Sequence, residues 1–198
     1  MSNEDITIAG LIGSRICHDL ISPIGAITNG LELLEMSGEA GSPEMTLIGQ
    51  SVGNASARIR FFRIAFGAAG DQMVGAAEVS SILRDLYAGS RLEVDWTPAE
   101  PKPRAAVRLA FLGILCLENA MPFGGRLSIS CTGADWSLNG VADRLNIDDS
   151  IWDVLEGGGA QASLQPSHVQ FALLPMIAAQ DGRKIITHIE TTQISLGF

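Results

Sequence analysis

Two runs of regularly spaced apolar residues constrain the fold of this chain most. The first run spans residues 16–34 and the second spans residues 45–66, each advancing in steps of three or four. Such steps return every side chain to one face of an α-helix, so both runs predict long helices. Residues 37–41 break the pattern, and Ser42-Pro43 then offers an N-cap and a first-turn proline. We therefore predict an antiparallel helical hairpin.

A lone hairpin cannot cover both apolar seams with its own two helices. Two hairpins paired into a four-helix bundle would cover them, with twofold symmetry as the default arrangement. We therefore expect a homodimer formed through residues 1–67. The seam residues are Ile16, Leu20, Ile24, Ile27, Leu31 and Leu34 in the first helix, and Met45, Ile48, Val52, Ala55, Ile59, Phe62 and Phe66 in the second.

The sequence changes in character after a linker at residues 67–71. Residues 75–198 mix helical and alternating strand patterns, which favours a two-layer α/β sandwich. The whole chain is thus predicted to be an α+β protein, with a dimerising hairpin in residues 1–70 and the sandwich in residues 75–198. Helices are expected at 76–87, 104–121, 148–156 and 167–180, and strands at 91–96, 126–131, 183–188 and 193–198.

Composition excludes several classes of function. A net charge of −9 argues against nucleic acid as the main partner. The longest apolar run, residues 109–117, is far shorter than the roughly 20 residues that span a bilayer. The acidic N-terminus shows no secretory signal, and Cys17, Cys116 and Cys131 have neither disulfide nor metal-site spacing. We expect a cytoplasmic protein without a membrane partner, a metal site or a cofactor.

His18 is the residue in the first helix with the clearest chemical potential. It lies two positions from Ile16 and Leu20, about 200° around the helix from each, so it faces water if they face the core. A neutral imidazole is a nucleophile near pH 7, and Asp19 could orient it by accepting a hydrogen bond. Pro23 costs a helix interior about 3 kcal/mol and frees the carbonyl of Asp19.

The surroundings of His18 leave room for another protein to approach it. Its neighbours on the same helix face are Ser14, Arg15, Ile21, Ser22 and Gly25, and several of them are small. A plainer interpretation also holds for this pattern: an exposed histidine beside an acid is ordinary surface. Asp19 could then simply pair with Arg15 four residues earlier.

Residues 18–24, His-Asp-Leu-Ile-Ser-Pro-Ile, resemble the H-box of sensor histidine kinases. The hairpin resembles the dimerisation and phosphotransfer domain of those kinases, and residues 75–198 are similar in layout to their ATP-binding domain. Asn119 matches the second asparagine of the kinase N-box. The tail, residues 180–185 and 191–193, resembles the last hairpin of that domain.

The sequence departs from the kinase pattern at the motifs that bind ATP in kinases. Leu115 stands where the N-box has its first asparagine, no Asp-x-Gly-x-Gly occurs, and Gly157-Gly158-Gly159 lacks the glycine pattern that follows in kinases. The whole chain, including residues 167–170, therefore resembles the ChpT-type histidine phosphotransferases. These are dimeric, kinase-shaped phosphorelay proteins whose ATP domain is degenerate.

This resemblance implies a bacterial multistep phosphorelay in which His18 receives a phosphoryl group from a receiver aspartate of a hybrid kinase. His18 would then pass the group to a response regulator, with Asp19 as the orienting and acid–base residue. The receiver would supply Mg²⁺, and the chain itself would bind no ATP. The expected docking surface consists of Ser14, Arg15, Ile21, Ser22 and Gly25, together with Arg58 and Phe61 on the facing helix.

Two other functions stay open on the sequence alone. The chain could be an ATP-dependent histidine kinase with divergent nucleotide motifs, or a non-catalytic dimeric scaffold that binds receiver domains. Labelling with ATP would identify the first, and receiver binding without transfer would identify the second.

Overall fold

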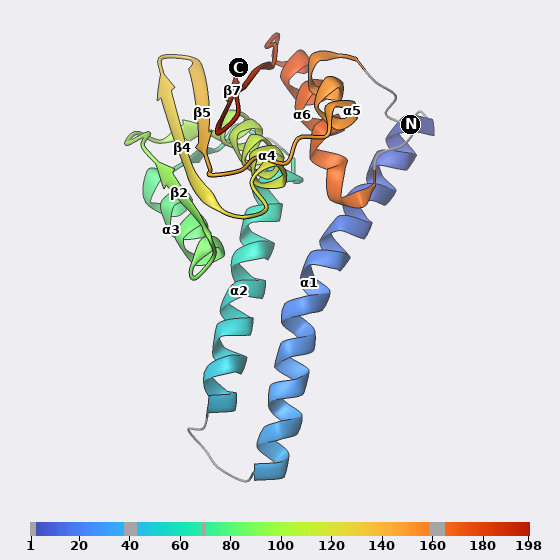
Figure 1. Ribbon diagram of the computed structural model, residues 1–198, viewed down its shortest axis with the longest axis vertical. Helices are drawn as coiled ribbons and strands as arrows, with labels where there is room; N and C mark the ends of the chain where they lie inside the picture. The colour runs from blue at the N-terminus through green and yellow to red at the C-terminus, as the bar shows by residue number, and fades with distance from the viewer. Residues whose placement is uncertain (1–2, 38–42, 69, 159–164) are drawn as a thin grey trace.

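The computed structural model describes residues 3–37, 43–68, 70–158 and 165–198 of the chain. Helices α1 (Asn3–Ser37) and α2 (Pro43–Ala65) lie side by side and antiparallel, as Figure 1 shows. The predicted hairpin is therefore confirmed. Of the predicted break at residues 37–41, Ser37 is the last residue of α1. Residues 38–42, which include the Ser42 cap, lie outside the described residues.

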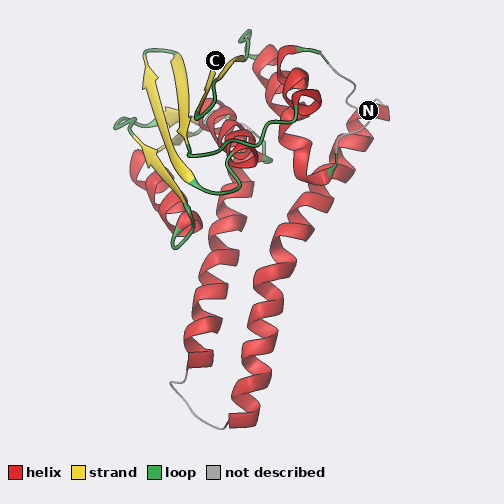
Figure 2. Ribbon diagram, viewed as in Figure 1, coloured by secondary structure: helices red, strands yellow, loops and turns green. Residues whose placement is uncertain are grey.

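The rest of the chain forms a mixed sheet with helices packed on it (Figure 2). The helices are α3 (Ala76–Tyr87), α4 (Arg104–Ala120), α5 (Asp149–Trp152) and α6 (Val169–Gln180), with 3₁₀ turns η1 (Asp153–Glu156) and η3 (Pro166–His168). The strands are β1 (Met73–Val74), β2 (Leu92–Trp96), β3 (Lys102–Pro103), β4 (Gly125–Thr132), β5 (Asp135–Val141), β6 (Ile186–Ile189) and β7 (Gln193–Gly197).

Five of these strands form the main sheet, in the order β2-β4-β5-β7-β6. Strand β2 runs parallel to β4 and the other neighbours are antiparallel. Alternate residues, such as Leu127 and Ile129 in β4 and Leu138 in β5, are buried, because one face of the sheet packs against the helices. The α+β class, with a helical hairpin and a sheet-and-helix layer, is confirmed.

The sheet and helices that follow the hairpin form a second unit. The C-terminal end of α2 enters the core of this second unit. Phe61 stacks on Phe111 of α4 with ring centroids 4.4 Å apart, and Phe62, Ile64 and Ala65 belong to the same buried cluster. On the other side, α1 lies against η3 and α6 near its N-terminal end (Figure 1). Each helix of the hairpin thus touches a different part of the second unit.

Three features of the second unit were not predicted. Strand β5 occupies the middle of the sheet, and β1 and β3 pair with each other as a separate two-stranded ladder. The helix expected at 148–156 changes at Asp153 from α-helix to the tighter 3₁₀ form.

Among the described residues, no helix is long and apolar enough to cross a membrane.

Candidate functional site

His18 projects from α1 into open solvent. Its side chain is 83% exposed, and Ser14, Ile21, Ser22 and Gly25 around it are exposed as well. The helix runs unbroken through this region, with Pro23 inside it and buried. The ring therefore stands on a regular helix, where a large partner can reach it.

The carboxylate of Asp19 is the centre of the polar contacts around His18. Its Oδ1 lies 3.2 Å from Nδ1 of His18, even though the two residues are adjacent on the helix. Its Oδ2 accepts from Nε of Arg15 at 2.8 Å and from Nη1 of Arg58 at 3.5 Å. Its side chain is only 10% exposed, so the acid is held between two guanidinium groups.

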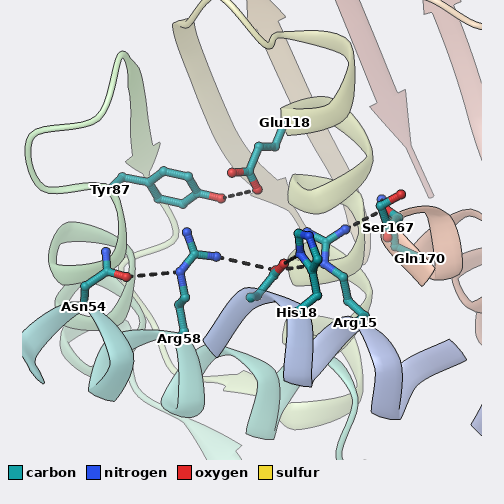
Figure 3. A network of polar contacts seen from close by, with 9 residues as sticks. Arg15, His18, Asn54, Arg58, Tyr87, Glu118, Ser167 and Gln170 are labelled. Atoms are coloured by element: carbon teal, nitrogen blue, oxygen red, sulfur yellow. Dashed lines mark hydrogen bonds and ion pairs between the residues drawn. The ribbon is translucent and has the colours of Figure 1, made fainter. Parts of the chain in front are cut away.

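Arg15 connects this carboxylate to the second unit. Its Nη1 donates to the backbone oxygen of Ser167 in η3 at 2.6 Å, and Nε2 of Gln170 donates to the same oxygen at 2.9 Å (Figure 3). The pair that the plainer sequence interpretation proposed, Arg15 with Asp19, is thus present together with the His18 contact.

Arg58 approaches the site from α2, where its Nε donates to the side-chain oxygen of Asn54 at 3.1 Å. Arg58 also lines a cavity of about 60 Å³ with Tyr87 and Glu118. The Tyr87 hydroxyl donates to the Glu118 carboxylate at 3.2 Å (Figure 3). Burial raises the pKa of Glu118 and also raises the pKa of Tyr87 well above its usual value.

A groove of about 880 Å³ runs beside the site between α1, α2 and the end of α3. Asp19, Ser22, Asn54 and Arg58 are among the residues that line it. Arg60 and Asp85 also line it, and their ion pair of 2.7 Å joins α2 to α3. The groove therefore gives a partner a concave surface of mixed polar and apolar side chains next to His18.

Most of the predicted site residues fall into two groups. His18, Ser14, Ile21, Ser22 and Gly25 share one accessible face of α1, whereas the side chains of Arg15 and Arg58 are largely engaged in the contacts described above.

The prediction that Phe61 lies on the docking surface is wrong. Its ring is 0% exposed, because α4 packs over this part of α2 and Phe111 stacks on it. In the single chain described here, a partner protein could not contact it.

Several residues that support the site were not assigned to it from the sequence. Asn54, Tyr87, Glu118 and Gln170 come from four different helices and reach the site only through the fold. Their spacing in the chain carries no signal of this arrangement. Among the described residues, no group of three or more His, Cys, Asp and Glu side chains is placed to hold a metal ion.

Comparison with known proteins gives the family. Residues 76–193 match the model of the histidine phosphotransferase C-terminal domain. The chain is 33% identical over 196 residues to protein phosphotransferase ChpT of Brucella abortus (strain 2308), covering 96% of this chain and 93% of the relative. The chain therefore belongs to the ChpT-type histidine phosphotransferase family.

Solved structures agree with this assignment. The 1.7 Å structure of a bacterial phosphotransferase is 33% identical, with a TM-score of 0.84 over 100% of this chain and 97% of that one. The histidine kinase ThkA, solved in complex with the response regulator protein TrrA, is only 12% identical. It matches with a TM-score of 0.50 over 98% of this chain and 62% of that one. The fold is thus shared with a histidine kinase.

Proposed function

We propose that this protein is a phosphorelay intermediate that carries a phosphoryl group on His18. The observation that supports the proposal best is the contact of 3.2 Å between Nδ1 of His18 and Oδ1 of Asp19 on an otherwise exposed ring. A ring that donates from Nδ1 to a carboxylate keeps its lone pair on Nε2, which points away from the helix contacts. Membership of the histidine phosphotransferase family agrees with this role.

The proposed step moves one phosphoryl group between two proteins. The Nε2 lone pair of His18 attacks the phosphorus of a receiver aspartyl phosphate, an N–P bond forms, and the P–O bond to the receiver aspartate breaks. The aspartate leaves as a carboxylate, and the Nδ1 proton of the resulting imidazolium stays hydrogen-bonded to Asp19. The reverse sequence with a second receiver returns the electrons of the N–P bond to Nε2. Positioning and electrostatic stabilisation dominate such transfers.

The surface around His18 supports receiver domains as donor and acceptor. Ser14, Ile21, Ser22 and Gly25 leave the ring accessible, and the groove of about 880 Å³ next to Asp19 offers a docking surface. The Mg²⁺ of the reaction would come with the receiver. We place the first receiver on a hybrid kinase and the second on a response regulator, in the cytoplasm.

Exposed apolar side chains on the hairpin support a homodimer. Ile24 and Leu31 on α1, and Met45, Val52 and Ile59 on α2, are each about half exposed in the single chain and stand seven residues apart. This spacing puts each set on one stripe of its helix. Asp19 lies roughly 140° around α1 from Ile24. His18 lies roughly 120° around α1 from Ile24. A second copy on the stripes would therefore leave His18 free.

We further propose that residues 1–70 and residues 75–198 have separate roles. The first unit carries His18 and the dimer face, and the second supports the site without binding ATP. Leu115 is buried where kinases have an asparagine, so its side chain offers a nucleotide no polar contact at that position.

A labelling experiment tests the proposed function. Full-length wild type, His18→Gln and the control His188→Gln, which changes an exposed histidine on β6, are incubated with a receiver domain carrying a labelled aspartyl phosphate. We expect acid-labile label on wild type and on His188→Gln, and no label on His18→Gln. Label retained on His18→Gln would refute the assignment of His18.

The same samples separate the two other functions. Incubation with labelled ATP and Mg²⁺ should leave wild type unlabelled, whereas a divergent kinase would label itself. A scaffold would bind the receiver equally well with and without His18, and it would remain unlabelled by the phosphorylated receiver.

A further inference from the structure

We infer that Arg15 is a positioning residue through which the second unit holds Asp19 against the His18 ring. This inference rests on the proposed function, and it changes the role of Arg15 from docking to orientation. It also gives the second unit, which is expected to bind no nucleotide, a direct part in the reaction.

The guanidinium of Arg15 makes two hydrogen bonds in different directions. Nε donates to Oδ2 of Asp19 on the same helix at 2.8 Å, and Nη1 donates to the backbone oxygen of Ser167 at 2.6 Å. The two acceptors lie in different units, since Ser167 is 152 positions away in the sequence. A guanidinium can span them because its donors form a rigid planar fork.

The anchor on the second unit is itself held in place. Gln170 is 1% exposed, and its Nε2 donates to the same Ser167 oxygen at 2.9 Å. This oxygen therefore accepts two hydrogen bonds, one from α1 and one from the first turn of α6. The position of this backbone oxygen is therefore fixed by hydrogen bonds, and Arg15, which donates to it, holds the Asp19 carboxylate through its second hydrogen bond.

The position of Asp19 decides which ring nitrogen of His18 is free to react. Arg15 and Arg58 both contact Oδ2, which leaves Oδ1 directed at Nδ1 of His18. If Arg15 releases the carboxylate, the acid can turn away from the ring and the Nδ1–H form loses its acceptor. The fraction of rings with a free Nε2 lone pair then falls.

The exposure of Arg15 agrees with positioning rather than docking. Its side chain is only 14% exposed, and the two hydrogen bonds use its Nε and one of its terminal nitrogens. A receiver would meet little of this side chain, whereas Ser14, Ile21 and Ser22 beside it are open.

Nuclear magnetic resonance of the His18 ring nitrogens tests the inference without any partner. The samples are full-length wild type, Arg15→Lys, Gln170→Ala and the control Arg63→Lys, an exposed arginine on α2. At a pH where the ring is neutral, we expect the Nδ1–H form to predominate in wild type and Arg63→Lys. Arg15→Lys keeps the charge but cannot span both acceptors, so its ring should shift toward the Nε2–H form. Gln170→Ala should shift it in the same direction.

Kinetics of transfer from a phosphorylated receiver separate positioning from docking. A positioning role predicts that Arg15→Lys lowers the maximal rate by about tenfold to a hundredfold, with an unchanged half-saturating receiver concentration. Asp19→Asn combined with Arg15→Lys should be no slower than Asp19→Asn alone, because the two residues act as one unit. A raised half-saturating concentration with an unchanged maximal rate would overturn the inference, and so would an unchanged ring tautomer in Arg15→Lys.

The two measurements also keep the inference separate from the function on which it rests. If the receiver does not label wild type, the phosphorelay role fails, but the tautomer measurement still decides whether Arg15 controls the ring. If wild type is labelled and Arg15→Lys is equally fast, the role stands and the inference fails.

Discussion

Asp19 connects the exposed ring of His18 to the interior of the molecule with a single carboxylate. One oxygen faces His18 and the other faces the two guanidinium groups of Arg15 and Arg58. An exposed acid next to a histidine would change rotamer freely, whereas charge-assisted hydrogen bonds from two sides hold this one in place. The exposed ring of His18 is therefore hydrogen-bonded to a carboxylate that is itself held in place.

Glu118 lines the small cavity beside Arg58, and its burial makes the folding stability depend on pH. Burial raises the pKa of Glu118 above its usual value, and this outweighs Arg15, Arg58 and the Tyr87 hydroxyl, which all lower it. Its contribution to stability is therefore fully present below the ordinary glutamate pKa and is lost as pH rises through the folded-state pKa. We expect Glu118→Gln to gain stability relative to wild type as the pH rises from the ordinary glutamate pKa through the folded-state pKa of Glu118, because glutamine cannot ionise.

Urea unfolding at several pH values measures this difference. The control is Glu100→Gln, which replaces an exposed carboxylate and should track wild type at every pH. A free-energy difference between wild type and Glu118→Gln that stays constant over the range would show that Glu118 does not titrate between the folded and unfolded states.

At the scale of elements, α1 and α2 are in close contact at Gly30. A methyl group added there would lie 2.6 Å from Cγ1 of Ile48, whereas one added at Gly25, five residues earlier, meets nothing within 4 Å. Replacing glycine by alanine inside a helix normally stabilises by about 1 kcal/mol. We expect Gly25→Ala to show this gain in thermal unfolding and Gly30→Ala to lose it, because Ile48 must move. Equal gains would mean that the helices are not in close contact at Gly30.

The periodic elements were predictable because their signals are local. The two seams of the hairpin have the three- and four-residue steps of a helix, and both hairpin helices are present, as is the helix expected at 104–121. Strand β5 was missed because Asp135, Asn139 and Gly140 disfavour strands in isolation. Its place is set by neighbours on both sides, since it pairs with β4 and with β7.

The same distinction applies to the site. His18 and Asp19 are adjacent in the sequence, so their contact could be anticipated, and so could the pair of Arg15 with Asp19. The bond from Arg15 to Ser167 spans 152 positions, and no local pattern indicates it. Phe61 was misplaced because helical phase does not reveal that α4 covers the end of α2.

At the scale of the whole molecule, both helices of the hairpin are anchored to the second unit. Phe61 and Phe62 of α2 belong to its core, and Arg15 of α1 bonds to the turn before α6. His18 lies on the hairpin within a few residues of the second contact. The second unit therefore can act on the site by holding α1, which gives a kinase-shaped domain a role that needs no nucleotide.

The proposed dimer is the property of the whole molecule that is most directly measurable. Wild type should have the mass of two chains in sedimentation or light scattering, because a second hairpin would cover the stripes that contain Ile59. Ile59→Asp should be a monomer, since an unpaired carboxylate would be buried in that interface. Ile186→Asp is the matched control, because Ile186 is 57% exposed against 54% for Ile59 but lies on β6, away from the hairpin. A monomeric wild type would mean that the dimer does not form, and an unchanged dimer in Ile59→Asp would place the interface elsewhere. In either case the exposed apolar stripes would need another partner.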